Sequence, residues 1–222
     1  SLSTGTLATS ALAPAELQLV RHIADHNAEA LALLERVVNR NSGTMNFEGV
    51  REVGEIFRAE LDRLGFRTRW VDGAPFGRAG HLIGERPVLG EGKPLRCLLI
   101  GHLDTVFEPQ SPFQRFERLP GDLARGPGAT DMKGGVVVML QALAALRAVG
   151  ALDSMVVTVV LTGDEELSGR PLALARAELI AAGAGADVAL GFEDGDGKFE
   201  TAVVARRGSS GWTLRVSGQA AH

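Results

Sequence analysis

The chain has 222 residues, enough for one large domain or two small ones. With 45% hydrophobic and 23% charged residues, its composition is that of a globular protein and not of a disordered chain. The formal net charge of -4 and the lack of a basic cluster argue against nucleic acid as a partner, and no apolar run is long enough to cross a membrane. The single cysteine, Cys97, excludes an internal disulfide bond.

The first residues of the chain are expected to form a flexible leader. Residues 1–14 are small, apolar and almost uncharged, and residues 11–13 (Ala-Leu-Ala) resemble a signal-peptidase site. The basic region that precedes such sites is absent. Both a cytoplasmic and a periplasmic location therefore stay open.

Amphipathic helices are predicted before the first strand. Apolar residues recur at helical spacing over residues 14–38, with a break near Asn27 compatible with the pattern. The same spacing over residues 47–64 predicts a second helical region, which Gly65 ends. A first strand is expected at residues 66–71.

Strands and helices then alternate through the middle of the chain. Further strands are expected at residues 81–84, in the apolar run that starts at Leu98, and at residues 155–161 and 186–192. A buried helix is expected at residues 136–149, and an Ala- and Leu-rich helix precedes the last of these strands. This alternation predicts an α/β fold with a mostly parallel sheet flanked by helices.

Two stretches do not fit the alternation. Residues 107–129 contain four prolines and no obvious element, which favours a functional loop. Near the end of the chain, strands are expected at residues 201–206 and 212–216 around a boundary at residues 207–211. The pattern therefore predicts a main domain over residues 15–207 and the start of a second domain over residues 208–222.

Chemically active residues follow several of the predicted strands and turns. In an open parallel sheet, the carboxyl ends of the strands form one edge at which ligands bind. We therefore expect these residues to converge. The residues are His102 and Asp104 after the central strand, Asp131 in the turn before the buried helix, Glu165 and Glu166 after residues 155–161, and Glu193 after residues 186–192.

One imidazole among several carboxylates is a ligand set suited to zinc and, less selectively, to cobalt or manganese. So many carboxylates would repel one another without a cation, whereas two cations bridged by one carboxylate would stabilise them. Adjacent Glu165 and Glu166 are expected to divide into one metal ligand and one general base. Asp104, two residues after His102 in an extended chain, is expected to accept a hydrogen bond from the second ring nitrogen.

Each of these residues also has a simpler structural explanation. His102 could be a core histidine beside a solvated aspartate, and Asp131 could cap the following helix. Glu165 and Glu166 could favour a helix macrodipole, and Glu193 could belong to a solvated turn. What distinguishes the metal site is that all of them are expected at the same edge of the sheet.

Phosphate binding is the main competing chemistry, because glycines flank Lys133 at the start of the buried helix. The segment lacks the Gly-x-x-x-x-Gly-Lys-Ser/Thr pattern, and Asp131 would repel a phosphate. The Gly-x-Ser-x-Gly elbow of a serine hydrolase is also absent. These observations favour a cation over an anion at this edge.

Three segments together resemble the dinuclear zinc peptidase and deacylase family that includes glutamate carboxypeptidase, acetylornithine deacetylase and succinyl-diaminopimelate desuccinylase. They are residues 101–106, 126–135 and 162–166. Met132, where many members have a second acid, makes the chain most similar to the glutamate carboxypeptidase branch.

The resemblance implies a role for each residue at the predicted edge. His102 and Glu193 would hold one zinc ion, Asp131 would bridge two, and Glu166 would hold the other. In the same comparison, Glu165 would be the general base, and Asp104 would orient His102.

The resemblance also implies that residues 15–207 form an incomplete catalytic domain and that residues 208–222 begin a lid and dimerisation domain. His222 would reach the site of the partner subunit in a homodimer and stabilise the developing oxyanion. Members of the family carry a further metal-binding histidine near the end of a considerably longer chain, and this sequence does not contain it. A 222-residue product is therefore expected to bind the second metal poorly and to be nearly inactive.

For the intact protein, the resemblance implies hydrolysis of an amide bond in a small N-acyl amino acid or a peptide with a free C-terminal carboxylate. An aminopeptidase or a specific N-deacylase on the same site is an alternative. A non-catalytic metal-binding or dimerisation module is another, although such a site needs no base such as Glu165. A nucleotide-binding protein is the third.

Overall fold

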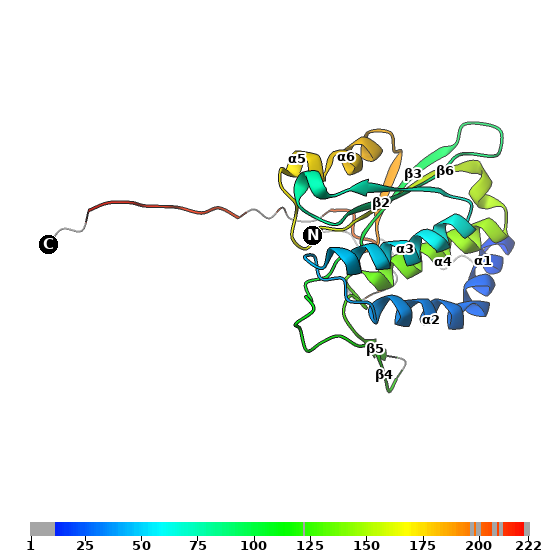
Figure 1. Ribbon diagram of the computed structural model, residues 1–222. Coiled ribbons are helices and arrows are strands. Elements are labelled where there is room, and N and C mark those ends of the chain that lie inside the picture. Colours follow the sequence, from blue (N-terminus) through cyan, green and yellow to red (C-terminus); the bar gives the residue numbers. More distant parts are fainter. Residues whose placement is uncertain are drawn as a thin grey trace, which may run out of the picture.

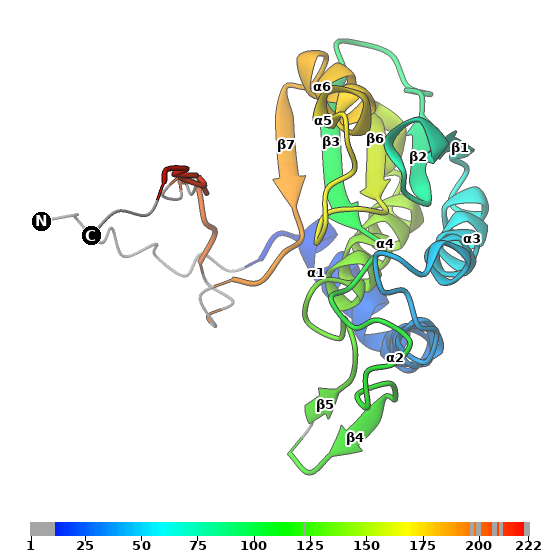
Figure 2. The same ribbon diagram turned by 60° about the vertical axis from the view of Figure 1, so that its left-hand side comes forward.

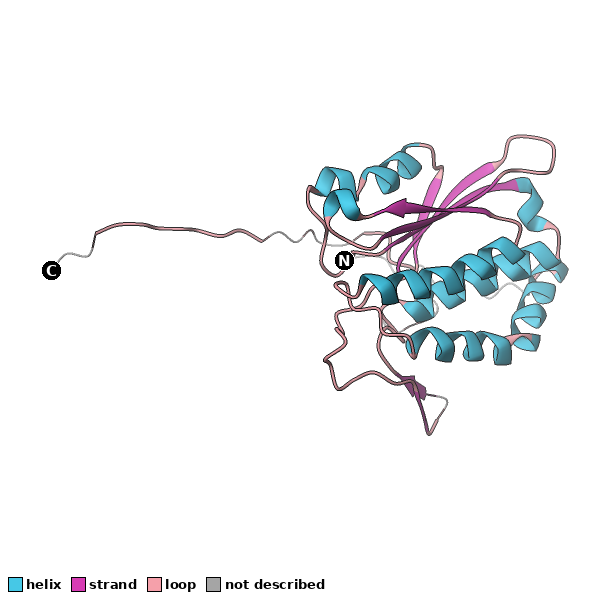
Figure 3. Cartoon of the chain, in the orientation of Figure 1, coloured by secondary structure: helices cyan, strands magenta, loops and turns pink. Residues whose placement is uncertain are grey.

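The computed structural model describes residues 12–121, 123–195, 198, 201–205, 208 and 211–219. In this part of the chain, a five-stranded sheet lies between two layers of helices, and a small two-stranded hairpin projects from one side (Figures 1 and 3). The elements are α1 (Pro14–Asp25), α2 (Asn27–Val38), α3 (Phe47–Arg63), β1 (Arg67–Asp72), the 3-10 helix η1 (Ala74–Phe76), β2 (Gly80–Arg86), β3 (Leu95–His102), β4 (Glu117–Leu119), β5 (Leu123–Arg125), α4 (Lys133–Ala148), the 3-10 helix η2 (Ala151–Ser154), β6 (Met155–Thr162), α5 (Leu172–Ala175), α6 (Ala177–Ala184) and β7 (Val188–Gly191).

The strands of the main sheet lie in the order β1-β2-β6-β3-β7. Strand β3 is parallel to both β6 and β7, whereas β2 is antiparallel to β1 and β6. Consequently β2 alone runs against the other four strands, and β7 forms one edge of the sheet (Figure 2). The predicted α/β fold with a mostly parallel sheet is confirmed.

The first helical region has the predicted break. Helices α1 and α2 meet at His26, one residue before Asn27. Helix α3 begins after Asn46, whose side chain accepts a hydrogen bond from the amide of Gly49 and so satisfies one of the free donors at the helix start. It ends at Arg63, and Gly65, two residues further on, adopts a positive φ of 86°.

Helices cover both faces of the sheet. Helices α3 and α4 pack on one face, with α1 and α2 against α4, and α6 packs on the other face (Figure 1). Successive residues of β6 point to opposite faces, so Val159 joins the larger core and Val160 joins the smaller one beneath α6. Strand β6 is therefore covered on both sides, as its run of β-branched residues predicts. Helix α4 is less completely buried than expected, since the side chain of Val138 is 60% exposed.

Two glycines allow close approaches that bring the ends of these elements together. A Cβ at Gly101 would lie 2.8 Å from Cε of Met132, and a Cβ at Gly135 would lie 1.8 Å from the carbonyl oxygen of Phe192. The lack of a side chain at Gly101 lets the end of β3 lie close to the start of α4. The lack of a side chain at Gly135 lets the segment after β7 lie close to the first turn of α4. The residues that follow β3 and β7 are thereby placed beside the turn that precedes α4.

Two expectations are wrong. Residues 107–129 are not wholly irregular, because β4 and β5 pair within them as an antiparallel hairpin. The strands expected at residues 201–206 and 212–216 are not seen, because the described residues 201–205 and 211–219 have no strand assignment and run away from the domain (Figure 1). A strand gains its stability from a paired neighbour, and alternation in the sequence cannot supply one.

The domain boundary near residue 207 falls partly outside the described residues, and the division of the chain at this point stays a prediction. Across the described residues, no helix has both the length and the apolar character required to cross a membrane.

Candidate metal centre

The register of the sheet brings the predicted site residues to one edge. His102, the last residue of β3, pairs with Thr162, the last residue of β6. The amide of Leu103 then donates to the carbonyl oxygen of Thr162 at 2.7 Å. On the other side of β3, the amide of Phe192 donates to the carbonyl of Ile100 at 3.4 Å, so the residues that follow β7 continue alongside His102.

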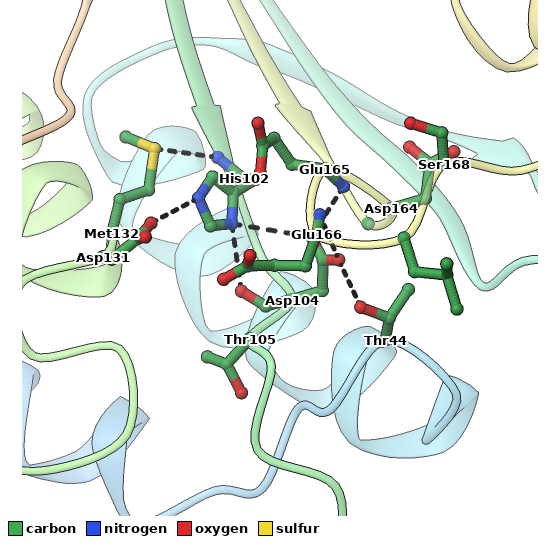
Figure 4. Close-up of polar contacts among 12 residues, drawn as sticks. Thr44, His102, Asp104, Thr105, Asp131, Met132, Asp164, Glu165, Glu166 and Ser168 are labelled. Carbon is green, nitrogen blue, oxygen red and sulfur yellow. Dashed lines mark hydrogen bonds and ion pairs between the residues drawn. The ribbon is translucent and has the colours of Figure 1, made fainter. Parts of the chain in front are cut away.

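His102 is buried, and both of its ring nitrogens have oxygen neighbours (Figure 4). Nδ1 lies 3.0 Å from the backbone carbonyl of Asp104 and 3.5 Å from its carboxylate. Nε2 lies 2.9 Å from Oδ1 of Asp131 and 3.6 Å from Oε1 of Glu193. A neutral ring that donates through Nδ1 to the carbonyl presents the lone pair of Nε2 to these two carboxylates.

The position of Asp104 differs in one respect from the prediction. The nearest acceptor for the second ring nitrogen of His102 is the main-chain carbonyl of Asp104 and not its carboxylate. The carboxylate is instead engaged by three donors, which are the Thr44 hydroxyl at 2.7 Å and the amides of Glu165 at 3.0 Å and Glu166 at 3.2 Å (Figure 4). Asp104 therefore connects the end of β3 to the turn that follows β6.

The donor atoms fit a divalent cation. One ligand atom from each of His102, Asp131 and Glu193 lies within 4.8 Å of the others. A buried imidazole and two partly exposed carboxylates form a nitrogen and oxygen set that zinc accepts. The residues present therefore match the type of ion that the sequence predicts.

The pKa values of the groups at this edge show the strength of the negative charge. Burial opposes the imidazolium form of His102, but Asp104, Glu193 and Glu165 outweigh it and raise the pKa to about 9. Burial, followed by the charge of Asp131, raises the pKa of Glu166 to about 6. Burial raises the pKa of Glu193 as well. The neighbouring carboxylates add to the rise in pKa of Glu166 and Glu193, and a cation at the centre would offset that repulsion.

The turn after β6 is held by a buried ion pair that the sequence analysis missed. Asp164 is fully buried, and its carboxylate accepts from Nη1 of Arg176 at 2.6 Å and from the amide of Gly169 at 2.7 Å. Arg176 also donates to Oγ of Ser168 at 2.8 Å. The macrodipole explanation for Glu165 and Glu166 is wrong, because the next helix begins only at Leu172.

Lys133 has a structural position beside Asp131. Its ammonium group donates to the carbonyl oxygens of Val37 and Arg40, each at 2.9 Å, at the end of α2. The side chain is fully buried, and burial lowers its pKa to about 7. Because the Lys133 ammonium group is buried and bound to these two carbonyl oxygens, it does not supply the positive charge that a phosphate site at this turn would need. The peptide bond between Asp131 and Met132 is cis.

A cavity of about 400 Å³ opens onto the acidic cluster. Asp131 and Glu166 are among the residues that line it, together with Phe107 and Phe113. The two rings contact each other edge to face, with centroids 5.0 Å apart. The cavity thus joins two of the predicted metal ligands to an apolar surface.

The structure accordingly places six of the seven predicted site residues at one edge of the sheet. His222 lies outside the described residues, and its role stays a prediction. Thr44, Asp164 and Arg176 belong to the same edge but were not predicted. Of these, only Asp164 carried a signal, as an acid directly before Glu165.

Comparison with known proteins identifies the class to which this α/β domain belongs. Residues 98–207 match the model of peptidase family M20/M25/M40. The chain belongs to this family of metallopeptidases, which confirms the resemblance seen in the sequence.

Among characterised relatives, carboxypeptidase G2 of Pseudomonas sp. (strain RS-16) is 32% identical over 229 residues, which cover 100% of this chain and 52% of the relative. Succinyl-diaminopimelate desuccinylase of Novosphingobium aromaticivorans is 33% identical over 144 residues, covering 62% of this chain and 36% of that enzyme. The chain thus spans about half the length of the first relative and less of the second.

The solved structure of human carnosine dipeptidase 1 matches with a TM-score of 0.62 and 21% sequence identity. The match covers 79% of this chain and 40% of the dipeptidase chain. At this level of identity, the comparison shows that the two chains share a fold.

Proposed function

We propose that the protein is a metal-dependent hydrolase that cleaves an amide bond of a small peptide or an N-acyl amino acid, in the manner of a carboxypeptidase. One observation carries the proposal. His102, Asp131 and Glu193 meet within 4.8 Å at the edge where Glu165 and Glu166 also lie. Membership of a metallopeptidase family supports this interpretation.

The metal ligands follow from the predicted set. His102 and Glu193 would hold one zinc ion, Asp131 would bridge, and Glu166 would hold a second ion, with cobalt or manganese as substitutes. Bound metal supplies Lewis acidity, which polarises a carbonyl group and lowers the pKa of water.

The protein's own contribution to hydrolysis is proton transfer. Glu165 would accept a proton from the attacking water and deliver it to the nitrogen of the leaving amine. A bond forms between the water oxygen and the acyl carbon, the carbon–nitrogen bond breaks, and the products are a carboxylic acid and an amine. The Asp104 carboxylate would support this step, because it accepts a hydrogen bond from the Glu165 amide and so limits movement of the turn after β6.

The substrate class is inferred from the relatives and from the cavity. One relative is a carboxypeptidase, and another removes a succinyl group from an amino acid derivative, as their names state. The cavity bounded by Asp131 and Glu166 lies where such a substrate would meet the carboxylates. A homodimer formed through a second domain, with His222 acting at the partner's site, completes the proposal.

The proposal is tested on the full-length protein by elemental analysis and by assays on N-acyl amino acids and C-terminal dipeptides. Glu165→Gln should retain two zinc ions per subunit and lose at least about a thousandfold in kcat, because only the base is removed. Glu91→Gln, at an exposed glutamate far from the site, is the matched control.

Two outcomes would contradict the mechanism. They are the absence of bound metal after reconstitution with zinc, and undiminished hydrolysis by Glu165→Gln. Substrates with blocked and free amino groups separate a carboxypeptidase or deacylase from an aminopeptidase.

A further inference from the structure

We propose that Thr44 is a positioning residue for the two glutamates that follow β6. Its hydroxyl group orients the carboxylate of Asp104, and that carboxylate fixes the main chain of Glu165 and Glu166. The inference rests on the proposed function of these glutamates as general base and metal ligand.

Three donors converge on the Asp104 carboxylate. The Thr44 hydroxyl donates to Oδ2 at 2.7 Å, and the Glu166 amide donates to the same oxygen at 3.2 Å. The Glu165 amide donates to Oδ1 at 3.0 Å. Both Asp104 and Thr44 are almost completely buried, so water does not compete for these contacts.

Thr44 is itself held rigidly. Residues 42–44 lie parallel to the segment after β3, because the Thr105 amide donates to the carbonyl of Ser42 at 2.9 Å and the Thr44 amide donates to the carbonyl of Thr105 at 3.2 Å. Gly43 makes this approach possible, since a Cβ there would lie 2.6 Å from Cα of Glu108. The hydroxyl therefore has a fixed position relative to Asp104.

Loss of this hydroxyl would leave the carboxylate free to change its partner. Nδ1 of His102 lies only 3.5 Å from Oδ1 of Asp104, so a rotated carboxylate can approach the imidazole and release the Glu166 amide. The turn would then lose a tether on the residues that carry the base and the ligand. Displacement of a base by a fraction of an ångström lowers the rate of the chemical step more than it weakens substrate binding.

A simpler explanation is that Thr44 only satisfies a buried polar group in the connection between α2 and α3. In that case its loss would lower stability without a specific effect on the turn after β6. The two explanations differ in what they predict for amide exchange at Glu165 and Glu166, and for kcat relative to KM.

The experiment compares Thr44→Val, Thr44→Ser and Thr68→Val in the full-length protein. Thr68 is a matched control, because its hydroxyl also donates to a carboxylate, that of Asp62, at 2.7 Å, but at an exposed position away from the site. Thr44→Val should lower kcat about tenfold with KM changed less than about twofold. Hydrogen exchange of the Glu165 and Glu166 amides should accelerate about tenfold, whereas Thr44→Ser and Thr68→Val should resemble the wild type.

The proposal is overturned if Thr44→Val and Thr68→Val behave alike, or if Thr44→Ser loses as much as Thr44→Val. Thr44→Ala, which removes the hydroxyl and adds no bulk, replaces Thr44→Val with the same expected values if the valine variant does not fold. A wild-type protein without hydrolytic activity contradicts the proposed function, while the exchange measurement still tests the role of Thr44.

Discussion

The turn after β6 and the segment after β7 both carry acidic residues to the same edge of the sheet, but they are held very differently. The β6 turn is fixed by Asp104 and by the buried pair of Asp164 and Arg176. Strand β7 has only four residues at the edge of the sheet, and the side chain of Glu193 beyond it is 40% exposed.

This difference indicates two ways of placing a metal ligand. The protein itself positions the β6 turn, because buried charges and amides would lose their partners if the turn moved. Glu193 has fewer constraints, and its approach to His102 at 3.6 Å brings it close to the charge of Asp131. We therefore expect that the β6 turn keeps its shape without metal and that Glu193 depends on the metal for its position.

The largest effect is expected where the β6 turn loses its ion pair. Arg176→Met leaves the Asp164 carboxylate buried without its counter-charge, and the free energy of unfolding should fall by about 3 kcal/mol. Urea denaturation measures this change. Arg67→Met, which removes an exposed arginine paired with Glu85, should have no measurable effect, and equal results for the two variants would show that the pair does not hold the turn.

Removal of Glu193 should change metal binding and metal-free stability in opposite directions. Glu193→Gln should weaken zinc binding by at least about tenfold, because a ligand is lost. Without metal, the variant should be more stable than the wild type, because the raised pKa of Glu193 shows that its negative charge is unfavourable in the folded protein. Calorimetric titration and thermal unfolding in a chelator measure the two quantities, with Asp194→Asn as the control. A less stable metal-free variant would contradict the comparison.

Metal binding at neutral pH should release a proton from His102. Its pKa of about 9 means that the metal-free imidazole is charged at pH 7 and must lose a proton to bind metal, so apparent affinity should rise about tenfold per pH unit up to pH 9. Without metal, the raised pKa stabilises the fold below about pH 6.5, and this contribution is lost as the pH rises through 9. Calorimetric titration of the metal-free protein with zinc should give heats of binding that differ between buffers of different ionisation enthalpy, because the buffer takes up the released proton. Identical heats would exclude the release.

The smallest effect is expected at the start of β7. Asp187 pairs with Arg96 at 3.1 Å on the surface, and that guanidinium lowers the pKa of the carboxyl group. Asp187→Asn should lower the Tm by less than about 2 °C, because exposed pairs add little stability. A larger loss would show that this pair, and not the close approach at Gly135, anchors the edge strand.

Much of the fold follows from local patterns in the sequence. The helical spacing at residues 47–64 and the β-branched run at residues 155–161 define elements that the structure contains, since a periodic apolar face must be buried. The position of His102 at the end of a parallel strand likewise indicates where the site lies.

The supporting contacts could not be predicted in the same way. Thr44 contacts Asp104 across 60 positions in sequence, and Lys133 reaches the end of α2 across 96. Such contacts depend on how separate elements pack, and a threonine in a turn or a lysine at a helix start gives no local sign of its partner. Residues 201–205 and 211–216 show the converse, because their alternation predicts strands, whereas they pair with no strand in the part of the chain that the structure describes.

The buried position of Lys133 limits where the chain can be shortened. Its ammonium group is bound to two carbonyl oxygens at the end of α2, directly beside the peptide that carries Asp131. An expression boundary placed after Arg40 would remove both carbonyl acceptors of this ammonium group, next to a predicted metal ligand. The N-terminal helices therefore belong to the structural unit that must be kept intact when the protein is trimmed, fused or grafted.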